Sequence, residues 1–346
     1  MKIRFITGNP DDNMGSYRIW VRDLSRTLLE INEDSKIVDI NPILTNSTDE
    51  NSHNLVIEEI KSADVLILGK SCYNILSEVK KINETAVIGV ININSDYVDD
   101  NIDFVIVGSW EEHCSLSYYE NVFFYPLIER SFENSKTKNH LPSKKIRVCY
   151  HGHYPHLSKF DPHVKEALEE ISKFFEVTMV TITGHPEFEW EIGRPDGIEV
   201  ENHRYDINTI SDIISSCDIG IVPNVSDMSH YFPQLKNIKD VDRGWNDTDF
   251  ILRFKNKTNG GRAYVLYQHG IPVIHDLSPN SFDFMAKSGE YTFAHDKLSY
   301  IRALKSLSCH ENRNRIALAN KEAFDKNFNP HEHAKKLKAF ITNIGK

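Results

Sequence analysis

The sequence predicts an α/β protein built from two doubly wound domains, each with a mainly parallel sheet. Three observations predict it. The length of 346 residues suits two domains. Short, continuously apolar runs alternate with helix-length segments throughout. A polar, charged stretch at 131–145 interrupts this alternation and marks a linker. We therefore expect a first domain at 1–130, a second at 146–326, and a final helix at 327–346.

Five apolar runs predict the strands of the first domain, at 2–7, 37–40, 63–68, 86–91 and 102–107. Between the first two, apolar residues at helical spacing predict a helix: Tyr17, Trp20, Val21, Leu24, Leu28 and Ile31. Arg18, Arg22 and Arg26 form a stripe on the opposite face. This stripe is either a solvated surface or, at Arg18, a contact with an anionic acceptor.

The second domain repeats the alternation, with strands expected at 146–150, 176–181, 198–202, 217–223 and 271–274. Helices are expected at 207–216 and 262–269, and after Asp161, which is placed as an N-cap before Pro162. Gly270 is placed to end the helix at 262–269 in a left-handed conformation. Helices at 297–308, 312–326 and 331–343 complete the chain.

The composition limits the function. The formal net charge of −10 argues against a general nucleic-acid binder, whose surface would be basic. Five scattered cysteines without Cys-x-x-Cys spacing indicate reduced thiols, and hence a cytoplasmic protein. The opening apolar run is too short for a signal peptide, and no run is long enough for a transmembrane helix.

Ligands of such sheets bind beyond the carboxyl ends of the strands, which directs attention to the loops 8–15, 69–73 and 108–114. The last of these contains His113, in Ser-Trp-Glu-Glu-His. His113 is a catalytic candidate that could move a proton or contact a sugar hydroxyl. The alternative is an ordinary surface histidine.

The stretch 254–280 contains the clearest binding signal. Asn259, Gly260 and Gly261 form a turn before a helix, with Lys257 and Arg262 close by. A glycine-flanked helix start with cations around it suits a phosphate group.

This stretch also resembles a known site. The order Lys257, Asn259, Arg262 and, after seven more residues, Gly-Ile-Pro-Val-Ile is similar to the nucleotide-sugar site of GT-B glycosyltransferases of family 4 (glycosyl transferases group 1). The resemblance covers roughly 145–310. It implies two Rossmann-like domains facing each other across a cleft, with the last helix crossing back to the first domain. It also implies a cytoplasmic, retaining, metal-independent enzyme of polysaccharide biosynthesis.

The resemblance further implies the substrates. The donor would be a UDP- or GDP-sugar, with no separate cofactor. The acceptor, held by the first domain, would be a glycan, a lipid-linked molecule or a small molecule. Peripheral contact with a membrane stays open, while nucleic acid is not expected as a partner.

Site residues follow from the same resemblance. Donor-binding positions are Gly15, Lys159, Glu201, Asn259, Gly260, Gly261, Ser278, Asn280 and Ser281. Lys257 and Arg262 would stabilise the leaving diphosphate. The chain departs from the family pattern at two positions that usually hold glutamate, because Lys257 and Val265 stand there.

Two other functions fit the sequence. One is a nucleotide-sugar 2-epimerase on the same two-domain plan, with His151, His153 and Glu201 as candidates. The other is a glycosyltransferase-like binding protein without catalysis, which the missing glutamates favour. An inverting transferase would need a base, for which His113, Asp11 and Asp12 are candidates. Asp247 and Asp249 form an Asp-x-Asp string, but we expect no metal site there.

Overall fold

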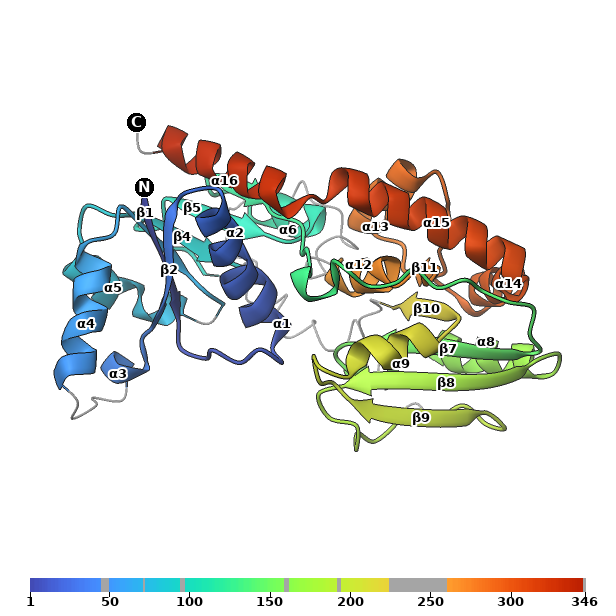
Figure 1. Ribbon diagram of the computed structural model, residues 1–346. Coiled ribbons are helices and arrows are strands. Elements are labelled where there is room, and N and C mark those ends of the chain that lie inside the picture. The colour runs from blue at the N-terminus through green and yellow to red at the C-terminus, as the bar shows by residue number, and fades with distance from the viewer. Residues whose placement is uncertain are drawn as a thin grey trace. The chain divides into compact units, whose positions relative to one another are not determined.

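The computed structural model describes residues 1–44, 50–70, 72–93, 97–158, 162–191, 194–223 and 260–344. It contains two parallel β-sheets with helices on their faces, which confirms the predicted α/β class (Figure 1). The chain forms two compact units. Unit 1 comprises the described residues up to Arg130 and from Phe328 onward. Unit 2 comprises the described residues from Ser131 to Asn327.

Unit 1 alternates strands and helices along the chain. Its elements are β1 (Lys2–Thr7), α1 (Gly15–Tyr17), a π-helical segment (Arg18–Asp23), α2 (Leu24–Glu30), β2 (Asp34–Asp39), α3 (Asn41–Leu44), α4 (Glu50–Lys61), β3 (Val65–Leu68), a 3-10 turn (Tyr73–Ile75), α5 (Leu76–Ile82), β4 (Val87–Ile91), β5 (Phe104–Val107), α6 (Trp110–Ser115), β6 (Val122–Phe124), a 3-10 turn (Arg130–Phe132) at its boundary, and α16 (Pro330–Ile344). The five predicted strands are present, and β6 was not predicted.

The strands of unit 1 run parallel in the order β2-β1-β3-β4-β5-β6. The chain leaves β1 toward one edge of the sheet and then continues from β3 toward the other edge. The position between β1 and β3 is therefore the topological switch point, where α/β sheets bind ligands. Apolar side chains fill both faces of this sheet, as the continuous apolar runs predict.

Helix α16 contributes to the core of unit 1. Ala334, Leu337 and Ile341 are buried in the same apolar cluster as β1 and β5. The ring of Phe340 stands edge-on to Phe104, with ring centroids 5.8 Å apart. The last helix thus packs against a sheet that also contains the first strand of the chain.

The first helix of unit 1 corrects the prediction for its arginine stripe. Arg26 is exposed, but Arg18 is only 3% exposed and belongs to the π-helical segment. Its guanidinium donates to Glu129 from Nε at 2.7 Å and from Nη2 at 2.6 Å, and to the carbonyl of Asp12 at 2.5 Å. Arg18 is therefore not on a solvated face, and the buried carboxylate of Glu129 neutralises its charge.

Unit 2 has the same alternation. Its elements are β7 (Lys145–His151), α7 (Pro155–Ser158), α8 (Pro162–Ser172), β8 (Glu176–Thr183), β9 (Glu199–Arg204), α9 (Ile210–Ser216), β10 (Ile219–Val222), α12 (Gly261–Gln268), β11 (Val273–His275), α13 (Pro279–Ser288), α14 (Lys297–Ser308) and α15 (His310–Asn327). The strands and helices predicted for this unit are present to within a few residues, whereas α7 and α13 were not predicted.

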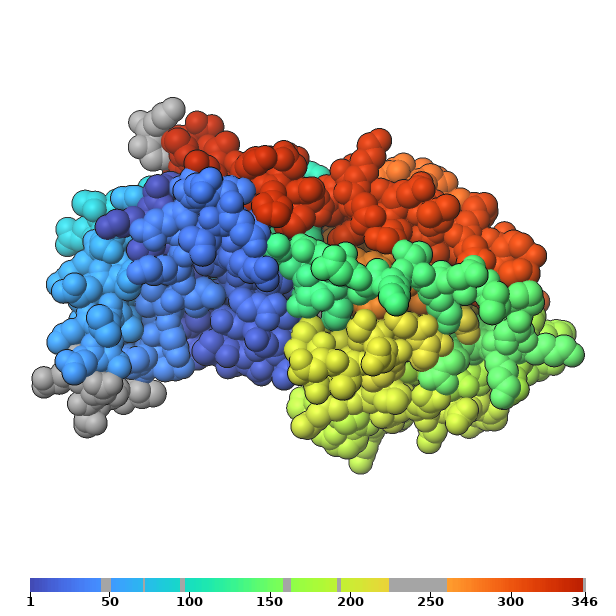
Figure 2. Space-filling model, viewed as in Figure 1, coloured from blue at the N-terminus to red at the C-terminus, as the bar shows by residue number. Residues whose placement is uncertain are grey.

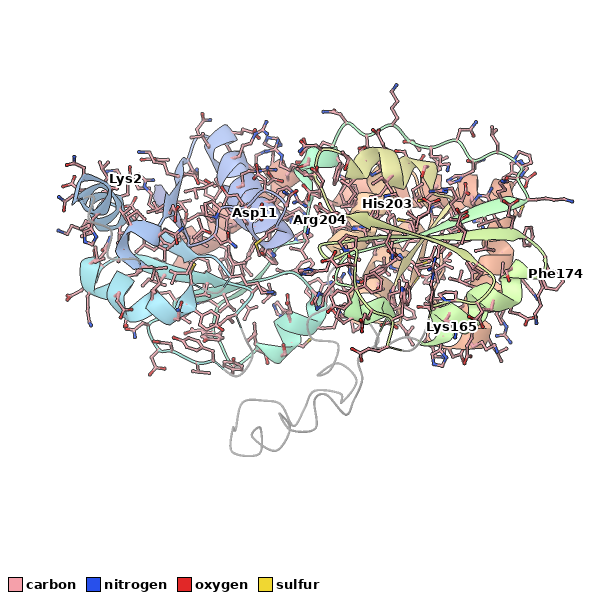
Figure 3. The ribbon with its side chains drawn as sticks, turned by 90° about the horizontal axis from the view of Figure 1, so that it is seen from below. Lys2, Asp11, Lys165, Phe174, His203 and Arg204 are labelled. Atoms are coloured by element: carbon pink, nitrogen blue, oxygen red, sulfur yellow. The ribbon has the colours of Figure 1, made fainter. Side chains whose placement is uncertain are left out.

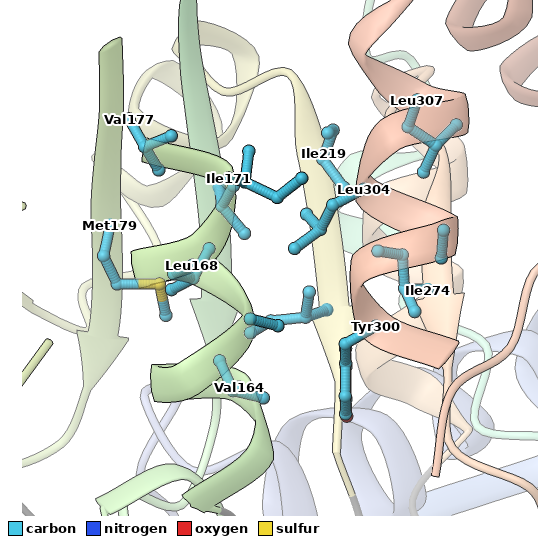
Figure 4. Packing of buried hydrophobic residues seen from close by; sticks show 14 of the residues in the cluster. Val164, Leu168, Ile171, Val177, Met179, Ile219, Ile274, Tyr300, Leu304 and Leu307 are labelled. Atoms are coloured by element: carbon cyan, nitrogen blue, oxygen red, sulfur yellow. The ribbon is translucent and has the colours of Figure 1, made fainter. Parts of the chain in front are cut away.

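The parallel sheet of unit 2 has the order β11-β10-β7-β8-β9, so its switch point lies between β7 and β10. Helices α8 and α14 cover one face. Figure 4 shows Leu168 and Ile171 of α8 and Leu304 of α14 pointing toward one another over the strands. This core holds the carboxyl ends of β7 and β10 in place.

The segment 131–145, predicted as a linker, is bonded along its length to unit 2, and we call it the strap. The Nζ of Lys138 lies 3.1 Å from Oδ1 of Asp218. The backbone of His140 exchanges two hydrogen bonds with the side chain of Asn314, at 2.8 and 2.9 Å. Figure 2 shows the strap in green, as a band between the yellow and the red residues of unit 2.

Gly270 lies under the strap, and replacing it with alanine is expected to lower the free energy of unfolding by about 2–3 kcal/mol. Its φ of +68° costs a residue with a Cβ roughly 1–2 kcal/mol. A Cβ there would also lie 2.8 Å from the backbone N of Lys138. Urea denaturation would measure the loss.

Gly289→Ala is the matched control for this prediction. Gly289 has a φ of +73°, but no atom lies within 4 Å of a Cβ at that position. Its replacement should cost only the backbone strain, about 1–2 kcal/mol. Equal losses of unfolding free energy in the two variants would show that the strap moves away from the added methyl group without cost.

Candidate functional site

The carboxyl ends of β7 and β10 bring together a glycine and an arginine that are 110 residues apart in the sequence. Gly152 follows β7 with a φ of +131°, a conformation that only glycine adopts readily. A Cβ on it would lie 2.7 Å from Cδ of Arg262, in the first turn of α12. Both requirements select glycine here, and the stem of Arg262 lies directly against its backbone.

Arg262 is 7% exposed and is held from both ends. Its Nη1 donates to the carbonyl of Pro223 at 3.3 Å and to the phenol oxygen of Tyr150 at 3.4 Å. Its own carbonyl accepts a hydrogen bond from Nε2 of His151 at 2.7 Å. Burial raises the pKa of Tyr150, so this phenol stays neutral and donates to the carbonyl of His153. The guanidinium is thus a preorganised positive charge at the switch point of unit 2.

The start of α12 lies beside this arginine. Gly260 precedes the helix, and a Cβ on it would lie 2.6 Å from Nδ2 of Asn280, a buried residue of α13. Gly261 is the first helical residue. The structure therefore brings Gly260, Gly261, Arg262 and Asn280 together. The backbone N–H groups at a helix start, with a cation beside them, favour an anion.

Ser278 and Ser281, both predicted to bind the donor, are buried and bonded to each other, Oγ to Oγ at 3.1 Å. The hydroxyl of Ser278 also caps α13 by accepting the N–H of Ser281 at 3.3 Å. In this structure both hydroxyls hold the beginning of α13, and their role toward a donor stays a prediction.

Glu201 lies apart from this group. It is in β9, three residues before the strand ends, and its carboxylate binds Nη1 and Nη2 of Arg147 at 2.7 Å each. Nε2 of His203 lies 3.2 Å from the same carboxylate. Figure 3 labels His203 and the neighbouring Arg204 on β9. The structure pairs the side chain of Glu201 with Arg147 and does not bring it to Arg262, and its predicted role toward a donor stays a prediction.

This pair makes the stability of unit 2 sensitive to acid. The hydrogen bonds from Arg147 lower the pKa of Glu201 from 4.5 to about 2. Because the folded-state pKa lies below the unfolded one, the stabilisation is complete above the unfolded value and is lost as pH falls toward 2. The two side chains are 30% and 29% exposed, so we expect a contribution of about 1 kcal/mol.

Urea denaturation at about pH 6 and about pH 3 would measure this contribution. Glu201→Gln should lose less stability between the two pH values than the unaltered protein does. Glu199→Gln, on the same strand, serves as the control and should behave like the unaltered protein. An unchanged pH dependence in Glu201→Gln would contradict the assignment.

Two predicted residues belong to unit 1. Gly15 begins α1 and has room for a side chain, because the nearest atom to an added Cβ is 3.9 Å away. His113 is half-buried in α6 beside Trp110, with ring centroids 5.7 Å apart. Burial lowers the pKa of His113, so its imidazole is neutral near pH 7 and can accept a proton.

Lys159, Lys257 and Asn259 lie outside the described residues, as do Asp247 and Asp249. Their predicted roles stay predictions. Val265, at the second family glutamate position, is 4% exposed in α12. Within the described part of the chain, no cluster of three His, Cys, Asp or Glu side chains could hold a metal ion.

Sequence reasoning missed Gly152 and Tyr150 as parts of the site. The loop after the strand at 146–150 was recognised, but nothing in it showed that Arg262 would pack on its glycine. The available signal was a glycine following a buried strand at the expected switch point.

No protein-family model matches the sequence, and no curated protein matches it by sequence. Comparison with solved structures is informative. The HepE protein of Anabaena, in complex with UDP and glucose, has a TM-score of 0.61 at 11% identity, over 99% of this chain and 100% of that one. The T4 phage β-glucosyltransferase has a TM-score of 0.56 at 14% identity, over 99% of each chain. A glycosyltransferase from Rickettsia africae has a TM-score of 0.61 at 12% identity, over 100% of this chain and 98% of that one.

These similarities extend over nearly whole chains, at identities that show the fold alone. The chain has the GT-B fold that the sequence resemblance implied, with two α/β units each built on a parallel sheet. None of the helices in the described residues is both long and apolar enough to cross a membrane.

Proposed function

We propose that this chain is a glycosyltransferase that uses a nucleotide-diphosphate sugar, with UDP as its nucleotide. The similar structures support this proposal, because HepE was solved with UDP and with UDP-glucose. A phage β-glucosyltransferase of the same fold was solved in the presence of uridine diphosphoglucose. The donor would bind to unit 2.

The observation that carries the proposal is the convergence of Arg262, Gly152 and the start of α12 at the switch point of unit 2. When the sugar leaves, its bond to the diphosphate breaks and the β-phosphate gains negative charge. A preorganised guanidinium and the helix N–H groups stabilise that charge more in the transition state than in the ground state. Gly152, having no side chain, lets the stem of Arg262 lie against the backbone and so holds the guanidinium at the switch point.

Binding of nucleotides tests the donor site. UDP at about a hundred times its Kd should stabilise the protein by about 2.7 kcal/mol in a thermal-shift experiment. GDP, ADP and CMP form the comparison panel, and uridine tests whether the diphosphate carries the binding. The absence of stabilisation by every nucleotide would contradict the proposal and favour a protein that has lost the donor site.

Turnover tests the reaction. We expect UDP release from a UDP-sugar to depend on an added hydroxyl-bearing acceptor. We also propose that no metal is required, so EDTA should leave the rate unchanged. Retention at the anomeric carbon is the expectation that comes with the family 4 resemblance, and NMR coupling constants of the product would check it. Epimerisation of the donor without an acceptor would contradict transfer.

A further inference from the structure

The sheet of unit 2 ends in β9, an edge strand whose outer side is covered by no strand of the described residues. Figure 1 shows β9 as the outermost arrow of this sheet. Proteins commonly protect such an edge with proline, lysine or a β-bulge. The sequence of β9, Glu-Val-Glu-Asn-His-Arg, contains neither proline nor lysine, and the strand pairs with β8 residue for residue, without a bulge.

The other sheet edges offer less backbone for pairing. Strands β6 and β11 have three residues each, whereas β9 has six. Strand β2 is as long as β9, but the N–H of Ser35 already donates to the carbonyl of Glu33 at 3.0 Å. Among the edges that the structure describes, β9 is therefore the one best suited to accept another strand.

Alternate residues of β9 turn their backbone groups outward. The N–H of Tyr205 donates to the carbonyl of Thr183 at 2.7 Å, so the odd-numbered residues face β8. The residues between them turn N–H and C=O away from β8, since successive residues of a strand face opposite sides. These outward residues are Val200, Asn202 and Arg204. The carbonyl of Val200 confirms the direction, because it accepts a hydrogen bond from the side chain of Arg194 at 3.2 Å.

The charges of β9 are arranged so that the strand complements itself. Glu199 and Glu201 occupy its first half, and His203 and Arg204 its second half. Figure 3 labels the two basic residues. Two antiparallel copies of the strand would bring the acidic half of each against the basic half of the other, which favours pairing.

The backbone limits the register of such a pair. In a symmetric antiparallel ladder, outward residues must face outward residues, because only they can exchange hydrogen bonds across the gap. A two-fold axis at Asn202 is the arrangement that uses all three outward residues. It also places Glu201 opposite His203 of the second copy, once on each side of the axis. An axis at Glu201 would instead place two carboxylates opposite each other.

We propose that β9 pairs with β9 of a second copy of this chain, antiparallel about an axis at Asn202. Asn202 exchanges hydrogen bonds with its counterpart, and Val200 exchanges them with Arg204 of the second copy. The carbonyl of Val200 has two lone pairs, so it can keep its bond from Arg194. The sheets of the two copies then form one continuous sheet. This pairing is independent of the proposed function.

Sedimentation equilibrium tests the association. One pair of strands buries less surface than a standard protein interface, so we expect a weak dimer with a Kd on the order of 100 µM. A concentration series from about 5 to about 500 µM should therefore show a reversible change from monomer to dimer. A monomer at every concentration would overturn the proposal.

Two substitutions of Asn202 test the role of the edge. Its N–H points outward, so proline at this position removes no hydrogen bond to β8. Asn202→Pro should therefore fold and stay monomeric. Asn202→Ala keeps the N–H and should dimerise like the unaltered protein. Both variants lose the bond between the Asn202 amide and the hydroxyl of Thr181, so they form a matched pair. Dimerisation of folded Asn202→Pro would overturn the proposal.

Hydrogen exchange resolved to single residues locates the interface in the unaltered protein, even if Asn202→Pro fails to fold. At low concentration, the amides of Glu201 and His203 should exchange slowly, because they face β8, and those of Asn202 and Arg204 quickly. At high concentration, Asn202 and Arg204 should become protected. A dimer in which these two amides still exchange quickly would place the contact elsewhere and overturn the proposal.

Charge variants test the register. His203→Glu would place two carboxylates opposite each other on both sides of the axis and should weaken the dimer by about 2- to 30-fold. His203→Lys keeps a basic side chain opposite Glu201 and serves as the control, with a Kd close to that of the unaltered protein. Equal Kd values for the two variants would overturn the register centred on Asn202.

Discussion

Replacing Arg262 with alanine is expected to weaken UDP binding by about 10- to 100-fold and to leave uridine binding nearly unchanged. A hydrogen bond to a charged group contributes about 1.5–3 kcal/mol, which corresponds to this range. Uridine has no diphosphate, so it should not sense the guanidinium. Isothermal titration with UDP and uridine would measure both affinities.

Two further variants separate charge from packing. Arg262→Lys keeps the positive charge but loses the two-pronged geometry, so it should retain part of the affinity for UDP. Arg302→Ala removes an exposed arginine of unit 2 and should change nothing. Because Arg262 also bonds Pro223 and Tyr150, thermal stability is recorded for each variant. Equal losses for UDP and uridine would show that Arg262 is structural.

Replacing Glu129 with glutamine is expected to destabilise unit 1 by about 3–5 kcal/mol, the largest effect on stability that we expect. Glu129 is fully buried and carries the compensating charge for Arg18, which is 3% exposed. Removal of one partner leaves a buried charge without its counterion. Urea denaturation followed by the fluorescence of Trp20, buried in the same helical region, would report on unit 1.

The same stripe of arginines provides the control. Arg26 is 66% exposed and pairs with Glu30, so Arg26→Ala should cost less than about 0.5 kcal/mol. The double variant Arg18→Met/Glu129→Leu should recover much of the loss, since an apolar pair of similar volume removes both charges. A loss below about 1 kcal/mol in Glu129→Gln would contradict the importance of this pair.

Much of the fold could be predicted from the sequence because its signals are local. A parallel strand with helices on both faces must be apolar at nearly every position, so β3, β4 and β5 stand out as continuous runs. The end of α12 was also predicted correctly, because Gly270 has the positive φ expected of a glycine that ends a helix. Strand β6 was missed because its three half-buried residues form an edge strand and provide only a weak pattern.

The candidate site could be predicted only in part, because the sequence signals are local and the site is not. A glycine-flanked helix start with Arg262 is a local pattern, and it predicted a phosphate site. That Arg262 packs on Gly152 and bonds Tyr150 depends on β7 and β10 being neighbours, which no local pattern specifies. In the sequence, Glu201 looks like an exposed strand residue. In the structure, Arg147 of β7 reaches over the intervening strand β8 and donates hydrogen bonds to the carboxylate of Glu201.

By itself, the sequence determined most of the segments that become strands and helices, and therefore the α/β class with two sheets. Those properties depend on residues a few positions apart, whose side chains share a face. The tertiary structure alone decided which charges are neutralised, since Arg18 meets Glu129 across more than a hundred residues and both are withdrawn from water. A charged side chain is available to bind a ligand only if folding does not pair it with an oppositely charged side chain. Burial strengthens such a pairing, because the electrostatic attraction is larger away from water.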